Sequence, residues 1–364
     1  MSKPALRPVG DNPTRLWGMD SRERLRRIAA AQGLSEGPDV ILADLRYAWD
    51  PVWSRHLAKL PGCVVARSGV PVLVHVAAGD AAAAERAMLA GDPLDPGLTM
   101  IDADDPAGIY NEALRKRERP FMDRLEPASV RRIERASYQG AYKGVTDLLT
   151  KYLWPGWAFH LTRLAAAIGL SPNGVTAIGT ALCVAATILF WHGWFWSGLA
   201  AGLGFMVLDT VDGKLARCTI TSSAIGNVWD HGIDLVHPPF WWWAWAHGCA
   251  AWGLALADTT FWWVMAVLIG GYVVQRLIEG AFIKLFGGMH IHVWRRFDSW
   301  FRLITARRNP NMVILFAALL LGRPDVGIVA VAAWTIISLV VHAVQLGQAL
   351  ERRRRGQPVV SWLG

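Results

Sequence analysis

The chain has 364 residues, of which 53% are hydrophobic and 20 are tryptophan, and its formal net charge is +8. Residues 174–208 and 235–257 contain no Asp, Glu, Lys or Arg. Because about 20 apolar residues span a bilayer as a helix, these windows exclude an ordinary soluble protein, whose helices would show amphipathic stripes. The basic charge is typical of membrane proteins with positively charged cytoplasmic loops, so we expect membrane lipids and no nucleic acid as partners.

Residues 1–130 have the composition of a soluble domain and are predicted to form a small α/β domain. Residues 39–45 and 70–78 are short aliphatic runs, which indicate buried strands. Helices that each begin with an Asp, a residue that caps helix N-termini, are predicted at residues 50–60, 80–90 and 105–118. Strands that alternate with helices are typical of the α/β class.

Residues 131–165 are basic and contain interspersed aromatic residues. This pattern predicts an interfacial juxtamembrane helix that lies at the membrane surface. A solvated linker helix is the alternative.

Residues 166–350 are predicted to form an all-α membrane domain, a bundle of six transmembrane helices. The crossings are expected near residues 174–192, 195–217, 224–247, 259–286, 304–322 and 326–349. Lys and Arg gather in the even-numbered links and in residues 351–364, which we expect to form a basic cytoplasmic tail. By the positive-inside rule, both termini lie in the cytoplasm, and we expect a multi-pass protein of a bacterial inner membrane.

Four aspartates interrupt this apolar domain. Asp209 and Asp212 lie at the end of the second expected crossing, and Asp230 and Asp234 lie on the third. Residues three and four apart share a helix face, so the four carboxylates can converge in a pocket that opens to the cytoplasm. An ionised Asp in mid-bilayer costs ~2.5–3.5 kcal/mol, and four would repel one another.

Hard divalent cations would neutralise such a cluster. Mg²⁺ (or Mn²⁺) prefers oxygen ligands, and two ions can clamp a diphosphate, so the four aspartates are predicted metal ligands. Gly213 and Gly226 lack a Cβ on the same faces, which allows a bulky ligand or a helix to approach. Arg217 follows one turn beyond Gly213 and can donate two hydrogen bonds to a phosphate. The alternative is a set of helix-end aspartates in water.

The spacing of these residues resembles the signature of the CDP-alcohol phosphatidyltransferase family. It does so at eight positions, which are Asp209, Asp212, Gly213, Ala216, Arg217, Gly226, Asp230 and Asp234. The stretch SPNGVT at 171–176 and the expected six helices are also similar, and the resemblance covers roughly residues 140–350.

The resemblance implies an enzyme that transfers a phospho-alcohol group from a CDP-alcohol to the hydroxyl of a second alcohol and releases CMP. It implies that Asp209, Asp212 and Asp230 bind metal, and that Asp234 binds metal or acts as the catalytic base. Gly213, Ala216, Arg217 and Gly226 would bind the CDP moiety. Family members are commonly homodimers, so the same is expected here.

The N-terminal part resembles relatives of di-myo-inositol-phosphate-phosphate synthases, which carry a cytidylyltransferase-like domain. The residues that suggest this are YNEALRKRERP at 110–120 and YKGVTDLLTKYLWP at 142–155. Residues 1–130 lack a glycine-rich nucleotidyltransferase loop, so we expect a non-catalytic remnant. The inositol link favours a polyol or polyol-phosphate substrate, and the expected acceptor is a small alcohol or a polyol phosphate.

Arginines near the fifth expected crossing are candidates for binding an anionic acceptor. The candidate acceptor-binding residues are Arg276, Arg302, Arg307 and Arg308. Their alternative role is anchoring to lipid headgroups. A second class of function is a cation or proton transporter that uses intramembrane aspartates. The gathering of the acidic residues at one side of the membrane argues against a transporter.

Overall fold

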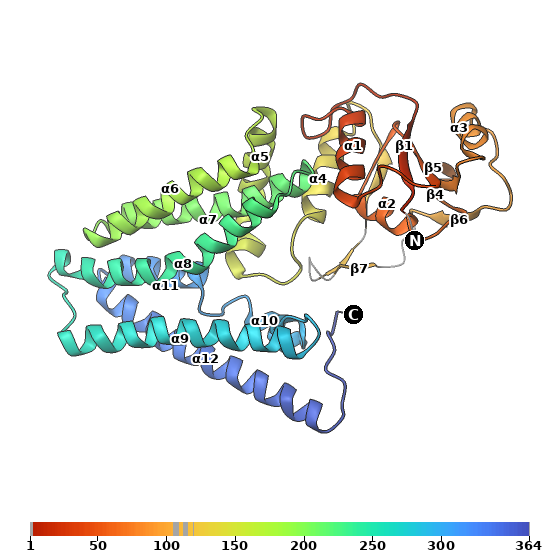
Figure 1. Ribbon diagram of the computed structural model, residues 1–364. Coiled ribbons are helices and arrows are strands. Elements are labelled where there is room, and N and C mark those ends of the chain that lie inside the picture. The colour runs from red at the N-terminus through yellow and green to blue at the C-terminus, as the bar shows by residue number, and fades with distance from the viewer. Residues whose placement is uncertain (1–2, 105–108, 112–115, 119, 364) are drawn as a thin grey trace.

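The computed structural model describes residues 3–104, 109–111, 116–118 and 120–363. An α/β domain lies at one end and a bundle of long helices at the other, with α4 and α5 between them (Figure 1). A small N-terminal α/β domain and a mainly helical remainder were both predicted, and both are confirmed.

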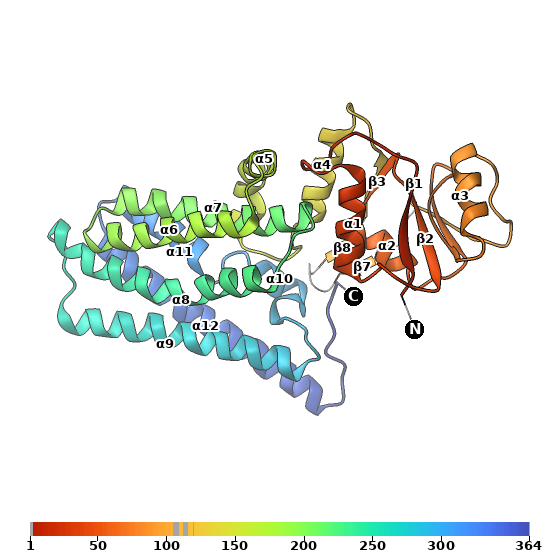
Figure 2. The ribbon, with the colours of Figure 1, turned by 45° about the horizontal axis from the view of Figure 1, so that its top comes forward.

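The N-terminal domain is built on a five-stranded sheet in the order β1-β2-β5-β4-β6. Its strands are β1 (Ala5–Val9), β2 (Asp39–Asp44), β4 (Cys63–Arg67), β5 (Val70–Ala77) and β6 (Thr99–Asp102). The β1–β2 and β4–β6 pairs are parallel, whereas β5 runs antiparallel to β2 and β4. Helices α1 (Ser21–Gln32) and α2 (Pro51–Leu57) cover one face, and α3 (Ala81–Ala90) covers the other (Figure 2).

Side chains alternate between the two faces of this sheet, as the pleat requires. Ile41 packs with Ile28 and Trp53 under α1 and α2, while its neighbours Val40 and Leu42 pack with Met88 under α3. Apolar side chains of one strand therefore fill two separate cores, which explains why the strand sequence is continuously aliphatic.

Most of the predicted elements of this domain are confirmed, namely the two strands, now β2 and β5, and two of the three helices, now α2 and α3. The helix predicted over 105–118 is wrong where the chain is described: β7 (Ile109–Asn111) and β8 (Lys116–Glu118) pair as antiparallel strands, and the other residues of that segment lie outside the described ones. The segment has too few apolar residues for a buried helical face, so strand pairing satisfies its backbone instead. A second small pair joins β3 (Tyr47–Trp49) to β9 (Met122–Arg124).

The single helix predicted over 131–165 is interrupted. Helix α4 (Val130–Gly140) ends before an irregular segment, and a π-helical turn, η1 (Leu149–Leu153), then leads into α5 (Trp154–Ala167). Asp147 terminates the irregular segment because its carboxylate accepts hydrogen bonds from the Thr150 backbone N–H, at 3.0 Å, and hydroxyl, at 2.8 Å. That contact starts a new helix, which a periodicity argument does not detect.

All six segments expected to cross the membrane are helical. They are α6 (Pro172–Trp191), α7 (Phe195–Cys218), α8 (Ala224–Gly248), α9 (Asp258–Leu285), α11 (Arg308–Leu320) and α12 (Pro324–Arg354). Among the described residues, α6, α9 and α12 are long and apolar enough to span a bilayer. Helices α7 and α8 contain the charged residues of the motif, and α11 has 13 residues, about 20 Å of helix. The count of six crossings therefore stays a prediction.

Between α9 and α11 the chain forms two short turns, η3 (Ile291–Val293) and α10 (Arg296–Phe301). The expected boundary at residue 350 lies inside α12, which continues to Arg354. The chain then returns toward α10 (Figure 1), where the Trp362 indole N–H donates to the Ser299 hydroxyl at 2.9 Å. The C-terminal segment thus packs on the protein instead of extending as a tail.

The N-terminal domain and the helical bundle share one apolar core. Leu16, Trp17 and Met19 pack with Phe159 of α5 and Leu215 of α7. The junction also contains a hydrogen bond of 2.8 Å from the Arg27 guanidinium to the backbone carbonyl of Thr219. The soluble domain is therefore packed directly on the end of α7 that carries the motif.

Candidate active site

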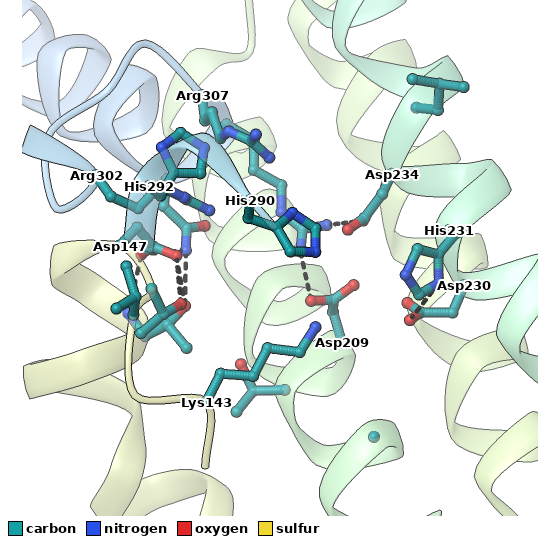
Figure 3. A pocket seen from close by; sticks show the side chains of 18 of the residues that line it. Lys143, Asp147, Asp209, Asp230, His231, Asp234, His290, His292, Arg302 and Arg307 are labelled. Carbon is teal, nitrogen blue, oxygen red and sulfur yellow. Dashed lines mark hydrogen bonds and ion pairs between the residues drawn. The ribbon is translucent and has the colours of Figure 1, made fainter. Parts of the chain in front are cut away.

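Three of the four motif aspartates converge between α7 and α8. Carboxylate oxygens of Asp209, Asp230 and Asp234 lie within 4.8 Å of one another. Asp209 projects from α7, whereas Asp230 and Asp234 occupy successive turns of α8 and so share one face (Figure 3). The convergence predicted from residue spacing is found for these three side chains.

Arg308, the first residue of α11, forms ion pairs with two of these carboxylates. One terminal nitrogen of its guanidinium donates to Asp234 and the other donates to Asp209. The guanidinium also lies over the Phe205 ring, 5.2 Å from its centroid. Sequence reasoning placed Arg308 with the acceptor-binding residues, but its contacts in the structure are with the acidic cluster.

Asp212, one turn after Asp209 on α7, is not part of this cluster and contacts Thr176 of α6 instead. It is 4% exposed, and its Oδ2 accepts a hydrogen bond of 2.6 Å from the hydroxyl of Thr176. Thr176 belongs to the SPNGVT stretch that already resembled the family in sequence. The hydrogen bond gives that stretch a role, because it fixes the orientation of a motif carboxylate.

The residues predicted to hold CDP occupy two different environments. Gly213 and Arg217 line the same cavity as the three clustered aspartates, and a Cβ on Gly213 would lie 3.2 Å from the Arg217 guanidinium. Gly226 instead packs against α6, where a Cβ would come within 2.4 Å of Asn173 Oδ1. Ala216 is half-buried on α7. Gly226 therefore serves close helix approach, one of the two roles proposed for it from sequence.

A segment that sequence reasoning did not assign to the site, the one that follows α4, closes this part of it. The backbone carbonyl of Ala141 accepts hydrogen bonds from Lys214, at 2.8 Å, and from Arg217, at 3.1 Å. The Lys214 ammonium also lies 3.2 Å from the centroid of the Tyr142 ring. The irregular segment after α4 thus orients Arg217 of the motif and the neighbouring Lys214.

The site is a cavity of about 410 Å³ bounded by α7, α8, α9, the start of α11 and the segment after α4. Its acidic wall is the aspartate cluster, and its basic wall includes Arg302 and Arg307 (Figure 3). Arg276 also lines the cavity. Acidic and basic groups therefore face a common space, as a phosphate-transferring site requires.

Glu279 on α9 organises the basic wall. It accepts hydrogen bonds from Arg276, at 2.7 Å, and from Arg307, at 2.7 and 2.6 Å. The Nε atoms of both arginines are buried and, among the described residues, lack a hydrogen-bond partner. No signal in the sequence marks Glu279, because its ion pair with Arg307 joins residues 28 positions apart.

His292, from the η3 turn, lies 3.4 Å from Glu279. Burial lowers the pKa of its imidazole well below the ordinary value, so His292 is neutral there. Glu279, His292 and His342 could together offer three ligand atoms to a metal ion. Two arginines already pair with Glu279, however, so this cluster fits an anionic ligand better than a cation.

Asp147 anchors the start of α11. It accepts a hydrogen bond of 2.7 Å from the side-chain amide of Asn309, next to Arg308. Burial alone would raise the pKa of the Asp147 carboxyl. The Arg302 charge and the hydrogen bonds from Thr150 and Asn309 outweigh burial and hold this pKa below its ordinary value.

The acidic cluster has the donor set of a magnesium or manganese site. It offers only carboxylate oxygens, which hard divalent cations prefer, and it faces a cavity with room for water and phosphate oxygens. The single guanidinium of Arg308 is shared by Asp209 and Asp234, so it does not neutralise all three clustered carboxylates. The residues present therefore fit a divalent cation.

Comparison with known proteins identifies the class. Residues 170–344 match the family model of CDP-alcohol phosphatidyltransferase, and they include every residue of the motif. These residues therefore form a CDP-alcohol phosphatidyltransferase domain, as the resemblance predicted.

Three individual proteins illustrate the similarity of this chain to known proteins. The chain is 34% identical over 127 residues to cholinephosphotransferase 1 of Gallus gallus and 31% identical over 133 residues to that of Homo sapiens. These matches cover 32% and 34% of this chain, and 36% and 32% of the relatives, so the chain spans about a third of their length. Archaetidylinositol phosphate synthase of Pyrococcus horikoshii is 27% identical over 193 residues, which is 53% of this chain and 92% of the relative.

Proposed function

We propose that this protein transfers a phospho-alcohol group from a CDP-alcohol donor to the hydroxyl of a second alcohol and releases CMP in polar-lipid synthesis. The observation that supports this proposal is the convergence of Asp209, Asp230 and Asp234 on a cavity whose opposite wall is basic, within the matched domain. A transporter gains no support, because the acidic residues gather at one end of the α7–α8 pair.

Asp209, Asp230 and Asp234 would hold Mg²⁺ or Mn²⁺, with Asp212 completing the motif beside them. When bound, two such ions would offset the charge of the diphosphate and make its phosphorus more electrophilic. The chain itself orients the donor: Arg217 faces the cavity near Gly213, where no Cβ obstructs a phosphate. Ala216 on α7 and Gly226, where α8 approaches α6, would support the cytidine side of this subsite.

Asp234 is proposed as the general base. Its side chain is 41% exposed, against 16% for Asp209, so an incoming hydroxyl can reach it. The acceptor oxygen forms a bond to the alcohol-side phosphorus while the bond from that phosphorus to the bridging oxygen breaks. The proton of the hydroxyl passes to Asp234, and CMP leaves with the bridging oxygen.

The basic wall is proposed to bind a phosphate on the acceptor. Arg276, Arg302 and Arg307 line this wall, and planar guanidinium groups bind phosphate oxygens in pairs. Arg308 pairs with the aspartates instead, so we assign the acceptor phosphate to the other three arginines. The match to almost the whole of an archaetidylinositol phosphate synthase favours a polyol phosphate as acceptor.

The topology is proposed to follow the sequence prediction. Six helices would cross a bacterial inner membrane, with both termini and the catalytic cavity on the cytoplasmic side and a homodimer as the assembly. The α/β domain, packed on the motif end of α7, would then also lie in the cytoplasm, as a non-catalytic remnant that supports the site.

The test is CMP release by the purified protein with Mg²⁺ or Mn²⁺ and a panel of CDP-alcohols and alcohol acceptors. Asp234→Asn should abolish release, whereas Asp258→Asn, at the start of α9, should leave it unchanged. Full activity of Asp234→Asn would overturn the assignment of the base. Absence of release by the unmodified protein with every donor would overturn the proposed function.

A further inference from the structure

A second cavity, of about 520 Å³, lies between α4 and the beginning of α5. Its basic lining residues are Arg135, Lys143, Lys151 and His160, and its aromatic ones include Tyr138 and Phe159. No Asp or Glu lines it among the described residues. The cavity is therefore a positively charged site with aromatic walls.

Two of the basic side chains are held against aromatic rings at its edge. The Arg135 guanidinium lies over Phe159, 5.5 Å from the ring centroid, and the Lys151 ammonium lies 5.4 Å from the centroid of Tyr152. Both residues are exposed, so their charges remain accessible to a ligand. Cation–π contact orients them without neutralising them.

An apolar stripe on α5 begins next to this cavity. Its members recur every three or four residues and are exposed: Leu153 (50%), Trp157 (70%), Leu161 (36%), Leu164 (56%) and Ile168 (67%). The opposite face of α5 packs into the protein through Ala158, Thr162 and Ala165. A helix with one buried face and one exposed apolar face at this spacing is suited to lie in the membrane interface.

The cavity also adjoins the catalytic one. Tyr142, Lys143 and Thr146 line both, and Lys143 extends into the catalytic cavity (Figure 3). A ligand in the second cavity would therefore contact the segment that orients Lys214 and Arg217.

We propose that this second cavity binds the headgroup phosphate of an anionic phospholipid whose acyl chains lie along the α5 stripe. Charge complementarity supports a phosphate headgroup as the ligand of this cavity, because basic side chains close to an anionic membrane surface bind its headgroups. The adjacent apolar stripe supports a lipid over a soluble phosphate, because the acyl chains of a lipid would cover the stripe and a soluble phosphate would leave it exposed. The proposal does not depend on the identity of the CDP-alcohol or of the acceptor.

The test is native mass spectrometry of the full-length protein in detergent, titrated with phosphatidylglycerol or phosphatidylcholine. We expect selective retention of phosphatidylglycerol and an apparent Kd raised roughly tenfold or more in the double variant Arg135→Gln/Lys151→Gln. The charge-preserving pair Arg135→Lys/Lys151→Arg should retain binding. Arg55→Gln/Arg131→Gln, which removes two exposed charges that do not line the cavity, is the matched control.

Unchanged affinity in Arg135→Gln/Lys151→Gln would overturn the proposal, as would equal retention of phosphatidylcholine by the unmodified protein. Displacement of phosphatidylglycerol by free glycerol phosphate would show that the cavity takes a soluble phosphate, and would overturn the lipid assignment. If the charge-removing variant fails to fold, the selectivity of the unmodified protein and the charge-preserving pair still decide the question. CMP release is not used, so failure here is distinct from failure of the proposed enzyme activity.

Discussion

Glu279 and Arg307 are joined across α9 and the start of α11 by two hydrogen bonds, at 2.7 and 2.6 Å, from one guanidinium nitrogen to both carboxylate oxygens. Arg276 donates to the same carboxylate, so one acid positions two arginines of the basic wall. The Glu279 carboxylate reduces the repulsion between the positive charges of Arg276 and Arg307, and both arginines line the cavity.

Replacement of Glu279 by Gln is expected to raise the KM for a phosphorylated acceptor about tenfold while kcat changes less. The amide keeps the shape but removes the charge that holds both arginines, and hydrogen bonds to charged groups contribute ~1.5–3 kcal/mol. Steady-state CMP release against acceptor concentration measures this. Glu351→Gln, an exposed acid on α12, is the control. An unchanged KM would remove Glu279 from any positioning role.

Asp209→Asn is expected to weaken binding of Mn²⁺ by at least tenfold, because it removes one of three clustered carboxylates and leaves the Arg308 charge less compensated. Electron paramagnetic resonance of added Mn²⁺ measures bound ion without requiring turnover. Asp258→Asn should bind Mn²⁺ as the unmodified protein does. Equal binding by Asp209→Asn would place the metal site elsewhere.

Thr176→Val is expected to lower activity and stability, because the Asp212 carboxylate loses a buried hydrogen-bond donor, which costs about 1–3 kcal/mol. Thr176→Ser keeps the hydroxyl and should restore most of both. Thermal unfolding in detergent and CMP release measure the two effects. If valine and serine behave alike, the contact with Asp212 has no energetic importance.

The stability contributed by Asp147 is expected to depend on pH. Its pKa is lower in the folded protein than in the unfolded chain, so the carboxylate stabilises the fold above the unfolded value of about 4. This contribution is lost as the pH falls through the folded pKa. Asp147→Asn should therefore unfold at a lower temperature than the unmodified protein at pH 7, and the difference should shrink below about pH 4.

Thermal unfolding between pH 3.5 and 7 tests this dependence. Asp123→Asn, at a more exposed site paired with Arg132, should show a smaller difference at pH 7. A difference between Asp147→Asn and the unmodified protein that does not change with pH would contradict the prediction.

The central part of the site follows from the sequence, because helical spacing alone places Asp230 and Asp234 on one face and turns Asp209 toward them. The orientation of Asp212 could not be predicted from the sequence, because it depends on the hydroxyl of Thr176, 36 residues earlier on another helix. Glu279 and Asp147 could not be found either. Their contacts with Arg307 and Asn309 join segments that are distant in sequence, and no local pattern indicates them.

The elements of the fold likewise divide into those that could be predicted from the sequence and those that could not. The long helices were located to within a few residues because apolar length is a local property. Helix α1 was missed although Asp20 caps it, accepting from the Glu23 backbone N–H at 2.7 Å, and Gly33 ends it in the left-handed conformation at φ 65°. The strands β7 and β8 were mistaken for a helix because pairing between strands is not visible in the composition of either strand.

The shared apolar core also constrains how the chain is made. Leu16, Trp17 and Met19 leave the ribosome about 200 residues before Leu215, against which they pack. Until Leu215 of α7 is in place, part of this apolar surface of the newly synthesised α/β domain is uncovered. The α/β domain is therefore translated before the bundle, but its surface at this junction is completed only after α7 has formed.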